Sequence, residues 1–129
     1  MSFEIVLADL KRIYEVNADL RNPRATRLTG TDVQRWSTCM SVPRRALYDQ
    51  IAMFLALGFH KSELTFNFCD SILIDIHTVI INKNERRPAL FWQVFLAFDA
   101  GEFYRDNKRD KDPSEEYTRP LIAQIIKSH

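Results

Sequence analysis

The stretch LTFNFCDSILIDIHTVIIN, residues 64–82, decides whether this chain is all-α or mixed. Its first half alternates apolar and polar residues as a strand does, and its β-branched content agrees with that interpretation. On a helical wheel, however, the apolar residues from Phe66 onward fill one broad arc, and only Ile74 and Ile81 fall outside it. A hairpin would also need a turn at the CDS tripeptide without glycine or asparagine. We therefore predict a helix within 62–82 and keep a hairpin there as the alternative.

Helical periodicity continues on both sides of this stretch. The other predicted helices cover residues 3–16, a short segment from Thr31, 41–58, 88–105 and 119–127. Residues 17–30 contain proline and glycine without apolar periodicity, which is typical of a loop. The prediction is one all-α domain over residues 1–129, a compact irregular bundle of five or six helices, with an α+β fold as the alternative.

Particular residues mark where the predicted helices begin and end. Thr31 and Gln34 have the spacing of a capping box. Ser41 can cap the following helix, and Gly58 is expected to end it, since glycine tolerates the left-handed conformation after a helix. Gly101 interrupts an otherwise apolar helix at a cost of about 1 kcal/mol, so we expect a close neighbour to pack against it.

Length and composition indicate a single globular domain. A chain of 129 residues fits one domain, and 46% hydrophobic residues against 27% charged ones indicate a globular chain. The net charge of +1 gives no overall attraction to nucleic acid or an acidic membrane. Glu4 and Asp9 interrupt the first apolar stretch, and no uncharged run approaches the ~20 residues of a membrane span. We expect a soluble, cytoplasmic protein with Cys39 and Cys69 as free thiols.

An acidic stripe follows the apolar segment near residue 90. Asp99, Glu102 and Asp106 are spaced i, i+3, i+7, and Trp92 and Phe95 precede them on the same helical face. We predict that both aromatic residues are buried and that at least one acid, Asp99 above all, pairs with an arginine. The candidate partners are Arg119 and the arginines of residues 21–45. Trp92 and the three acids form the candidate binding site for a protein partner.

Support for metal or enzyme chemistry is weaker. Asp70 and His77 lie two turns apart on one face of the helix within 62–82, where they can converge with Asp99 and Glu102, so they are the weak candidates for metal ligands. The sequence has no nucleophile motif, and its three glycines cannot build a phosphate-binding loop. We expect no cofactor and no catalytic activity, and we rank a metal protein or enzyme third among the candidate functions.

Residues 31–57 resemble a helix-turn-helix motif in outline. A short helix, a tight turn and a longer helix follow one another, and Arg35, Arg44 and Arg45 are the candidate contacts to nucleic acid. Ser41 stands in the turn where such motifs usually have glycine. The second helix also becomes too apolar after its first turn to lie in a groove. A DNA-binding regulator is therefore the alternative function.

The leading prediction is a small helical protein that works by contacting another protein. Three of its predicted helices are apolar over about half their circumference or more, and a bundle of this size can surround only one of them. Another chain is expected to cover the excess, so a homodimer is also predicted.

Overall fold

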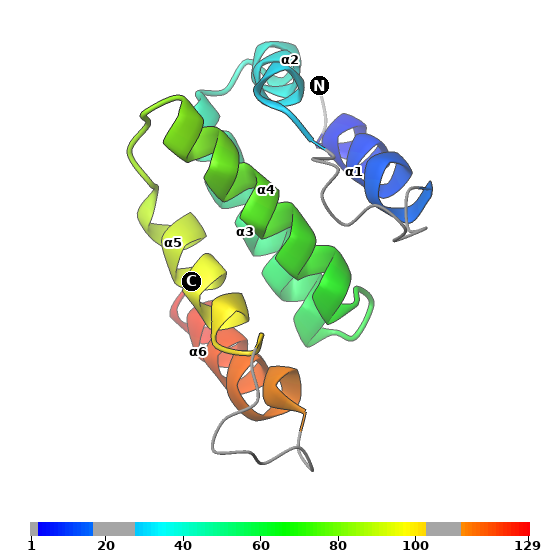
Figure 1. Ribbon diagram of the computed structural model, residues 1–129, viewed down its shortest axis with the longest axis vertical. Helices are drawn as coiled ribbons and strands as arrows, with labels where there is room; N and C mark the ends of the chain where they lie inside the picture. The colour runs from blue at the N-terminus through cyan, green and yellow to red at the C-terminus, as the bar shows by residue number, and fades with distance from the viewer. Residues whose placement is uncertain (1–2, 17–27, 103–111) are drawn as a thin grey trace.

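A computed structural model describes residues 3–16, 28–102 and 112–129, and these residues form an all-α structure (Figure 1). The elements are α1 (Glu4–Val16), α2 (Gly30–Met40), α3 (Arg44–His60), α4 (Phe66–Asn82), α5 (Ala89–Asp99), the π-helical turn η1 (Ser114–Thr118) and α6 (Arg119–Ser128). The described residues include no strand. The all-α prediction is confirmed, and the alternative hairpin within 62–82 is wrong. None of the helices in these ranges combines the length and apolar composition that a membrane span requires.

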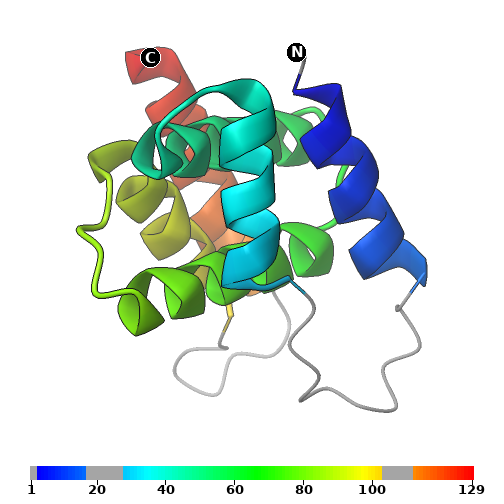
Figure 2. The ribbon, with the colours of Figure 1, turned by 90° about the horizontal axis from the view of Figure 1, so that it is seen from above.

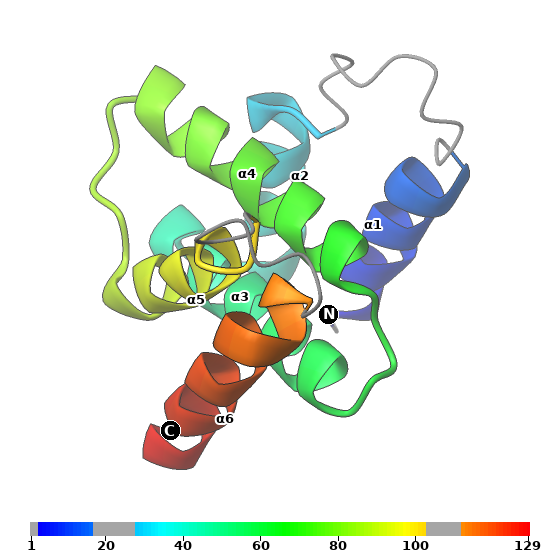
Figure 3. The same ribbon diagram turned by 60° about the horizontal axis from the view of Figure 1, so that its bottom comes forward.

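Helix α3 lies at the centre of the bundle. It packs against α2, α4, α5 and α6, while α1 packs against α4. Helices α1 and α6 therefore lie on opposite sides of the molecule (Figures 2 and 3). The core is largely aliphatic and aromatic. Its largest fully buried side chains include Trp36, Tyr48, Phe91 and Phe98.

At the corner between α2 and α3, the residues that cap the helices differ from those predicted. Thr29 and Asp32 form the capping box of α2, so Thr31 lies within the helix. Ser41 ends α2 in the left-handed conformation, with φ 56° and ψ 42°, instead of capping α3. Ser37 is buried, and its hydroxyl donates a hydrogen bond of 2.5 Å to the Val42 carbonyl. The predicted tight corner is present.

Two glycines are required by close packing. Helix α3 continues through Gly58 to His60. Leu64 occupies the space that a β-carbon at residue 58 would need, so the glycine is required by packing and does not end the helix. Helix α5 ends at Asp99 instead of residue 105. Just beyond it, buried Gly101 packs against η1, as the prediction of a close neighbour required.

Candidate functional site

Arg44, one of the predicted nucleic-acid contacts, joins α3 to the segment between α4 and α5. Its guanidinium donates to both carboxylate oxygens of Glu85, at 3.1 and 3.2 Å, and to the Tyr48 hydroxyl at 3.2 Å. The Tyr48 hydroxyl in turn donates to Glu85 at 2.7 Å. Only 18% of the Arg44 side chain is exposed. Its hydrogen-bonding capacity is therefore largely used within the bundle.

Arg35 is also engaged within the chain. It forms ion pairs with Asp9 at 2.9 Å and with Asp32 at 3.3 Å. Burial raises the pKa of Asp9, but hydrogen bonds from Trp36 and Arg35 outweigh it, so the pKa lies below its usual range. Arg45 differs from both arginines, because it is exposed and makes no ion pair with any described residue. Among the described residues, Arg45 is thus the one candidate contact that is free for an external ligand.

Trp92 of the candidate binding site stacks on its neighbour Phe95 at the surface. Trp92 and Phe95 are partly buried, not buried as predicted, and their ring centroids lie 5.1 Å apart at an interplanar angle of 10°. His77 of α4 lies 5.4 Å from Trp92 and 4.6 Å from Phe95. The Arg87 guanidinium lies 3.9 Å from the centre of the Trp92 ring. We call these four residues the aromatic cluster.

His77 belongs to this cluster and has no hydrogen-bond partner at its buried Nε2 atom within the described residues. Burial, and then the charge of Arg87, lowers the pKa of His77. Its neighbours on the same face of α4 are Ile74 and Ile81, of which 41% and 61% is exposed. The aromatic cluster therefore continues into exposed apolar surface on α4.

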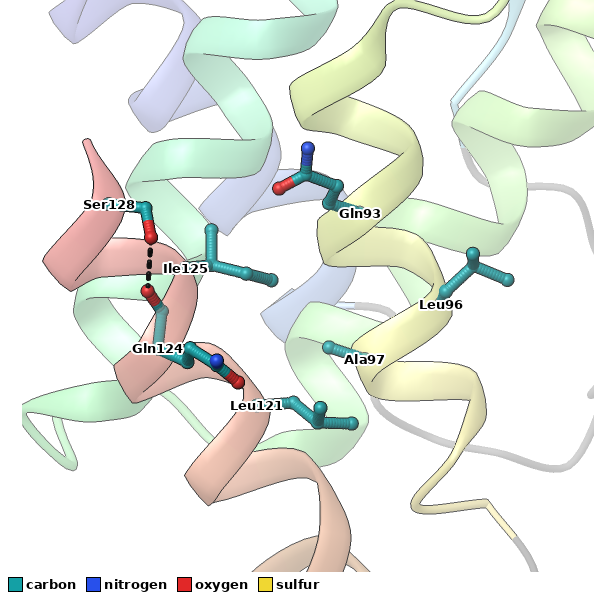
Figure 4. A pocket seen from close by; sticks show the side chains of 7 residues that line it. All are labelled: Gln93, Leu96, Ala97, Leu121, Gln124, Ile125 and Ser128. Carbon is teal, nitrogen blue, oxygen red and sulfur yellow. Dashed lines mark hydrogen bonds between the residues drawn. The ribbon is translucent and has the colours of Figure 1, made fainter.

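A second apolar feature lies on the other side of α5, where it faces α6. A hollow of about 410 Å³ is lined by Leu96 and Ala97 of α5 and by Leu121 and Ile125 of α6 (Figure 4). Polar residues Gln93, Gln124 and Ser128 complete the lining. Leu96 is 45% exposed and Leu121 is 40% exposed. Apolar surface thus flanks α5 on both sides.

The acids at the end of α5 meet a third acid and not an arginine. Asp70 of α4 shares a hydrogen bond with Glu102 and lies near Asp99. Burial, then this hydrogen bond and the negative charges of Glu102 and Asp99, raises the pKa of Asp70 to about 8. We call these three residues the acidic cluster.

Asp99 pairs with none of the candidate arginines that the structure describes, and the candidates within residues 17–27 lie outside the described residues. Asp99 is exposed and makes no ion pair with a described residue. Arg119, the proposed partner, pairs with Glu115 at 2.6 Å and donates to the Phe59 carbonyl at 3.0 Å. Asp106, the last acid of the predicted stripe, lies outside the described residues. The acids near the end of α5 are thus available to a cation from outside the described part of the chain.

The weak metal candidates have separate surroundings. Asp70 belongs to the acidic cluster, while His77 contacts aromatic rings. Within residues 3–16, 28–102 and 112–129, no three His, Cys, Asp or Glu side chains are grouped to hold a metal ion. Cys69 is buried, its thiol lies 3.6 Å from the Leu55 carbonyl oxygen, and burial raises its pKa to about 12. This thiol is therefore a poor nucleophile in the folded protein.

Replacing Asp70 with asparagine should stabilise the protein at neutral pH. The pKa of Asp70 is about 8 in the folded protein and about 3.9 in the unfolded chain. The contribution of protonated Asp70 to the free energy of unfolding is therefore fully present below about pH 4 and is lost as the pH rises towards 8. Asparagine is neutral without taking up a proton and can still donate to Glu102, so the cost of protonating residue 70 at neutral pH disappears. After a discount for partial exposure, we expect a gain of about 2 kcal/mol at pH 7.

Urea unfolding of the wild type and Asp70→Asn at pH 7 and pH 4 measures this gain. It should shrink towards zero at the lower pH. An equal difference at both pH values would show that the protonation of Asp70 is not its origin.

The sequence prediction missed several surface residues. Ile74 and Ile81 could have been found, because they are the two apolar residues outside the apolar arc of the helical wheel. An apolar residue in that position is expected to be exposed, as both are. No local pattern marked Leu96 or Leu121, because their exposure depends on how α5 and α6 pack. The position of Arg87 over Trp92 likewise depends on the path of the chain between α4 and α5.

Comparison of the chain with protein-family models, curated proteins and solved structures finds no match. Its function must therefore be inferred from the chemistry of the surface around α5.

Proposed function

We propose that this protein works by binding another protein through the outward-facing side of α5 and the adjoining surfaces of α4 and α6. One observation carries the proposal. The large exposed hydrophobic side chains in the described part of the chain all lie on these three helices: Ile74, Ile81, Leu96 and Leu121. Exposed apolar side chains gathered on neighbouring helices are typical of interaction sites. Trp92 adds a side-chain type that is enriched among the strongest contributors to binding.

The chemistry of this surface also describes the partner. The hollow between α5 and α6 is within the size range of binding pockets and can accept apolar side chains. At the carboxyl end of α5, Asp99 and Glu102 lie near the negative end of the helix dipole, where a cation is favourable. The fitting partner therefore presents apolar side chains with an arginine or lysine at one end.

A photo-reactive residue at position 96 tests this proposal. It should form a covalent adduct with a protein, because Leu96 is exposed, lines the hollow and follows the aromatic-cluster residue Phe95 on α5. Gln50, exposed on α3, is the matched control position and should give no adduct. Mass spectrometry of the adducts identifies the partner. Equal labelling from both positions, or none from position 96, would contradict the proposal.

The DNA-binding alternative has less support from the geometry. Arg35 and Arg44 pair with acids of the same chain. Arg45 lines a hollow of about 520 Å³ with Arg86 and Arg87. Asp49 also lines this hollow, and it accepts a hydrogen bond of 2.8 Å from the Phe91 N–H. Protein contact through α5 is the function that the exposed residues favour.

A further inference from the structure

The outward-facing side of α5 has opposite charges at its two ends. The positive charge of Arg87 lies over the Trp92 ring, at the amino end of the helix. Asp99 is exposed at the carboxyl end. Trp92, Leu96 and Asp99 are spaced i, i+4, i+7, so they share one stripe of the helix. Seven residues of α-helix separate Trp92 from Asp99 by about 10 Å.

Neither charge is neutralised within the part of the chain that the structure describes. Arg87 and Asp99 make no ion pair there, and at about 10 Å they are too far apart to pair with each other. Glu102, three residues beyond Asp99, adds negative charge at that end, whereas Asp70, whose pKa is raised to about 8, is largely protonated at pH 7. Between the ends lie the apolar side chains of Phe95 and Leu96. Along the helix axis the face is therefore positive, then apolar, then negative.

We propose that the partner on this face is a second copy of the chain, with the two α5 helices antiparallel and a twofold axis near Leu96. This inference rests on the proposed function and names its partner. The twofold axis places the positive end of one copy opposite the negative end of the other. Arg87 of each copy then faces Asp99 of the other, and the two Leu96 side chains meet at the centre. A parallel arrangement would place like charges opposite each other.

Symmetry makes this arrangement self-consistent. In an isologous interface each contact occurs twice, so two Arg87–Asp99 pairs flank one apolar centre. An apolar centre with charges at the rim is the usual anatomy of a protein interface. The exposed Ile74 of α4 and Leu121 of α6 lie on helices that adjoin α5 on either side. These helices extend the apolar surface beyond the stripe of α5 itself.

Charge reversal at both ends tests the arrangement by analytical ultracentrifugation. The wild type should sediment as a dimer at tens of micromolar. Arg87→Glu places two acid–acid pairs in the interface, and Asp99→Arg places two arginine–arginine pairs there. Each variant alone should dimerise about a hundredfold more weakly, because like charges opposite each other cost several kilocalories per mole.

An equimolar mixture of the two variants is the decisive sample. In the mixed dimer, the glutamate introduced at position 87 of one copy faces the arginine introduced at position 99 of the other. The second pair of the mixed dimer is the native Arg87–Asp99 pair, so both pairs are attractive. Dimerisation should therefore return close to the wild-type level, which misfolded variants cannot produce. Arg12→Glu makes the same charge change on α1, where the side chain is 64% exposed, and should leave dimerisation unchanged.

The outcomes separate this inference from the proposed function. A wild-type monomer, or a mixture that stays monomeric, would overturn the second-copy inference. If position 96 then still cross-links to a different protein, the proposed binding face stands with another partner. A dimer that is insensitive to both charge reversals would also overturn the antiparallel arrangement.

Discussion

The Gly101→Ala variant should lose about 3 kcal/mol of unfolding free energy. A β-carbon at this buried position would overlap the hydroxyl oxygen of Thr118. It would also lie 3.0 Å from the Ser114 α-carbon and 3.2 Å from Cε2 of Phe66. None of these neighbours is the free end of a flexible side chain. The added carbon must therefore displace either the backbone of η1 or packed core atoms.

The hydrogen bond of Thr118 adds to this cost. Thr118 is fully buried and donates to the Ala97 carbonyl at 2.8 Å, which joins η1 to α5. Overpacking costs typically about 1–3 kcal/mol, and leaving buried polar groups without a partner costs about 1–3 kcal/mol. The two costs are not fully additive, because a rotation of Thr118 that breaks its hydrogen bond also relieves the overlap, so the expected loss of about 3 kcal/mol lies below the sum of the mid-range values, about 4 kcal/mol.

Gly30→Ala is the matched control for this substitution. A β-carbon there would meet the flexible end of Lys83 at 3.2 Å, which can move aside. Urea unfolding of both variants should show a large loss at residue 101 and little change at residue 30. Similar values for the two would mean that η1 moves away from α5 without cost.

Glu85→Ala should destabilise the protein by a similar amount, about 3 kcal/mol. The substitution leaves the Arg44 guanidinium and the Tyr48 hydroxyl without their shared acceptor. Tyr48 is fully buried, and the side chains of Arg44 and Glu85 are 18% and 25% exposed. Removing one partner of such a pair leaves a poorly solvated charge, which costs more than the pair itself contributes.

Glu115→Ala provides the comparison at an exposed ion pair. Glu115 pairs with Arg119 at 2.6 Å, but 55% of its side chain is exposed, so its loss should cost only about 0–1 kcal/mol. Both variants can be measured by urea unfolding at pH 7. Equal losses would show that solvent compensates Arg44 as well as it compensates Arg119.

The helices were predictable from local pattern, but several of their ends were not. The arc of apolar residues in 66–82 was sufficient to choose helix over hairpin. Gly58 is the residue type that typically ends a helix, yet α3 continues to His60, and the glycine is needed there because Leu64 occupies the space of a β-carbon. Helix α5 ends two residues before Gly101, which packs closely against η1. Because η1 comes later in the sequence, the local pattern around residue 99 does not reveal this contact. Such ends depend on tertiary neighbours that periodicity does not encode.

The candidate site was predictable to a similar degree. The spacing of Asp99 and Glu102 placed them on one face, and their convergence with Asp70 was anticipated as a weak metal site. Their charge partners were not predicted correctly among the described residues, since Arg35, Arg44 and Arg119 pair with other acids. Arg44 and Glu85 are 41 residues apart, and no spacing rule links residues across such a distance.

The rate at which the buried Cys69 thiol is alkylated can measure how often this bundle opens. Its thiol lies between α3 and α4, so an alkylating reagent can reach it only when the helices separate. Cys39, which is partly exposed, reacts without that separation and provides the reference rate. The ratio of the two rates therefore reports how often the centre of the molecule opens, and any ligand that holds the helices together will slow the reaction at Cys69 alone.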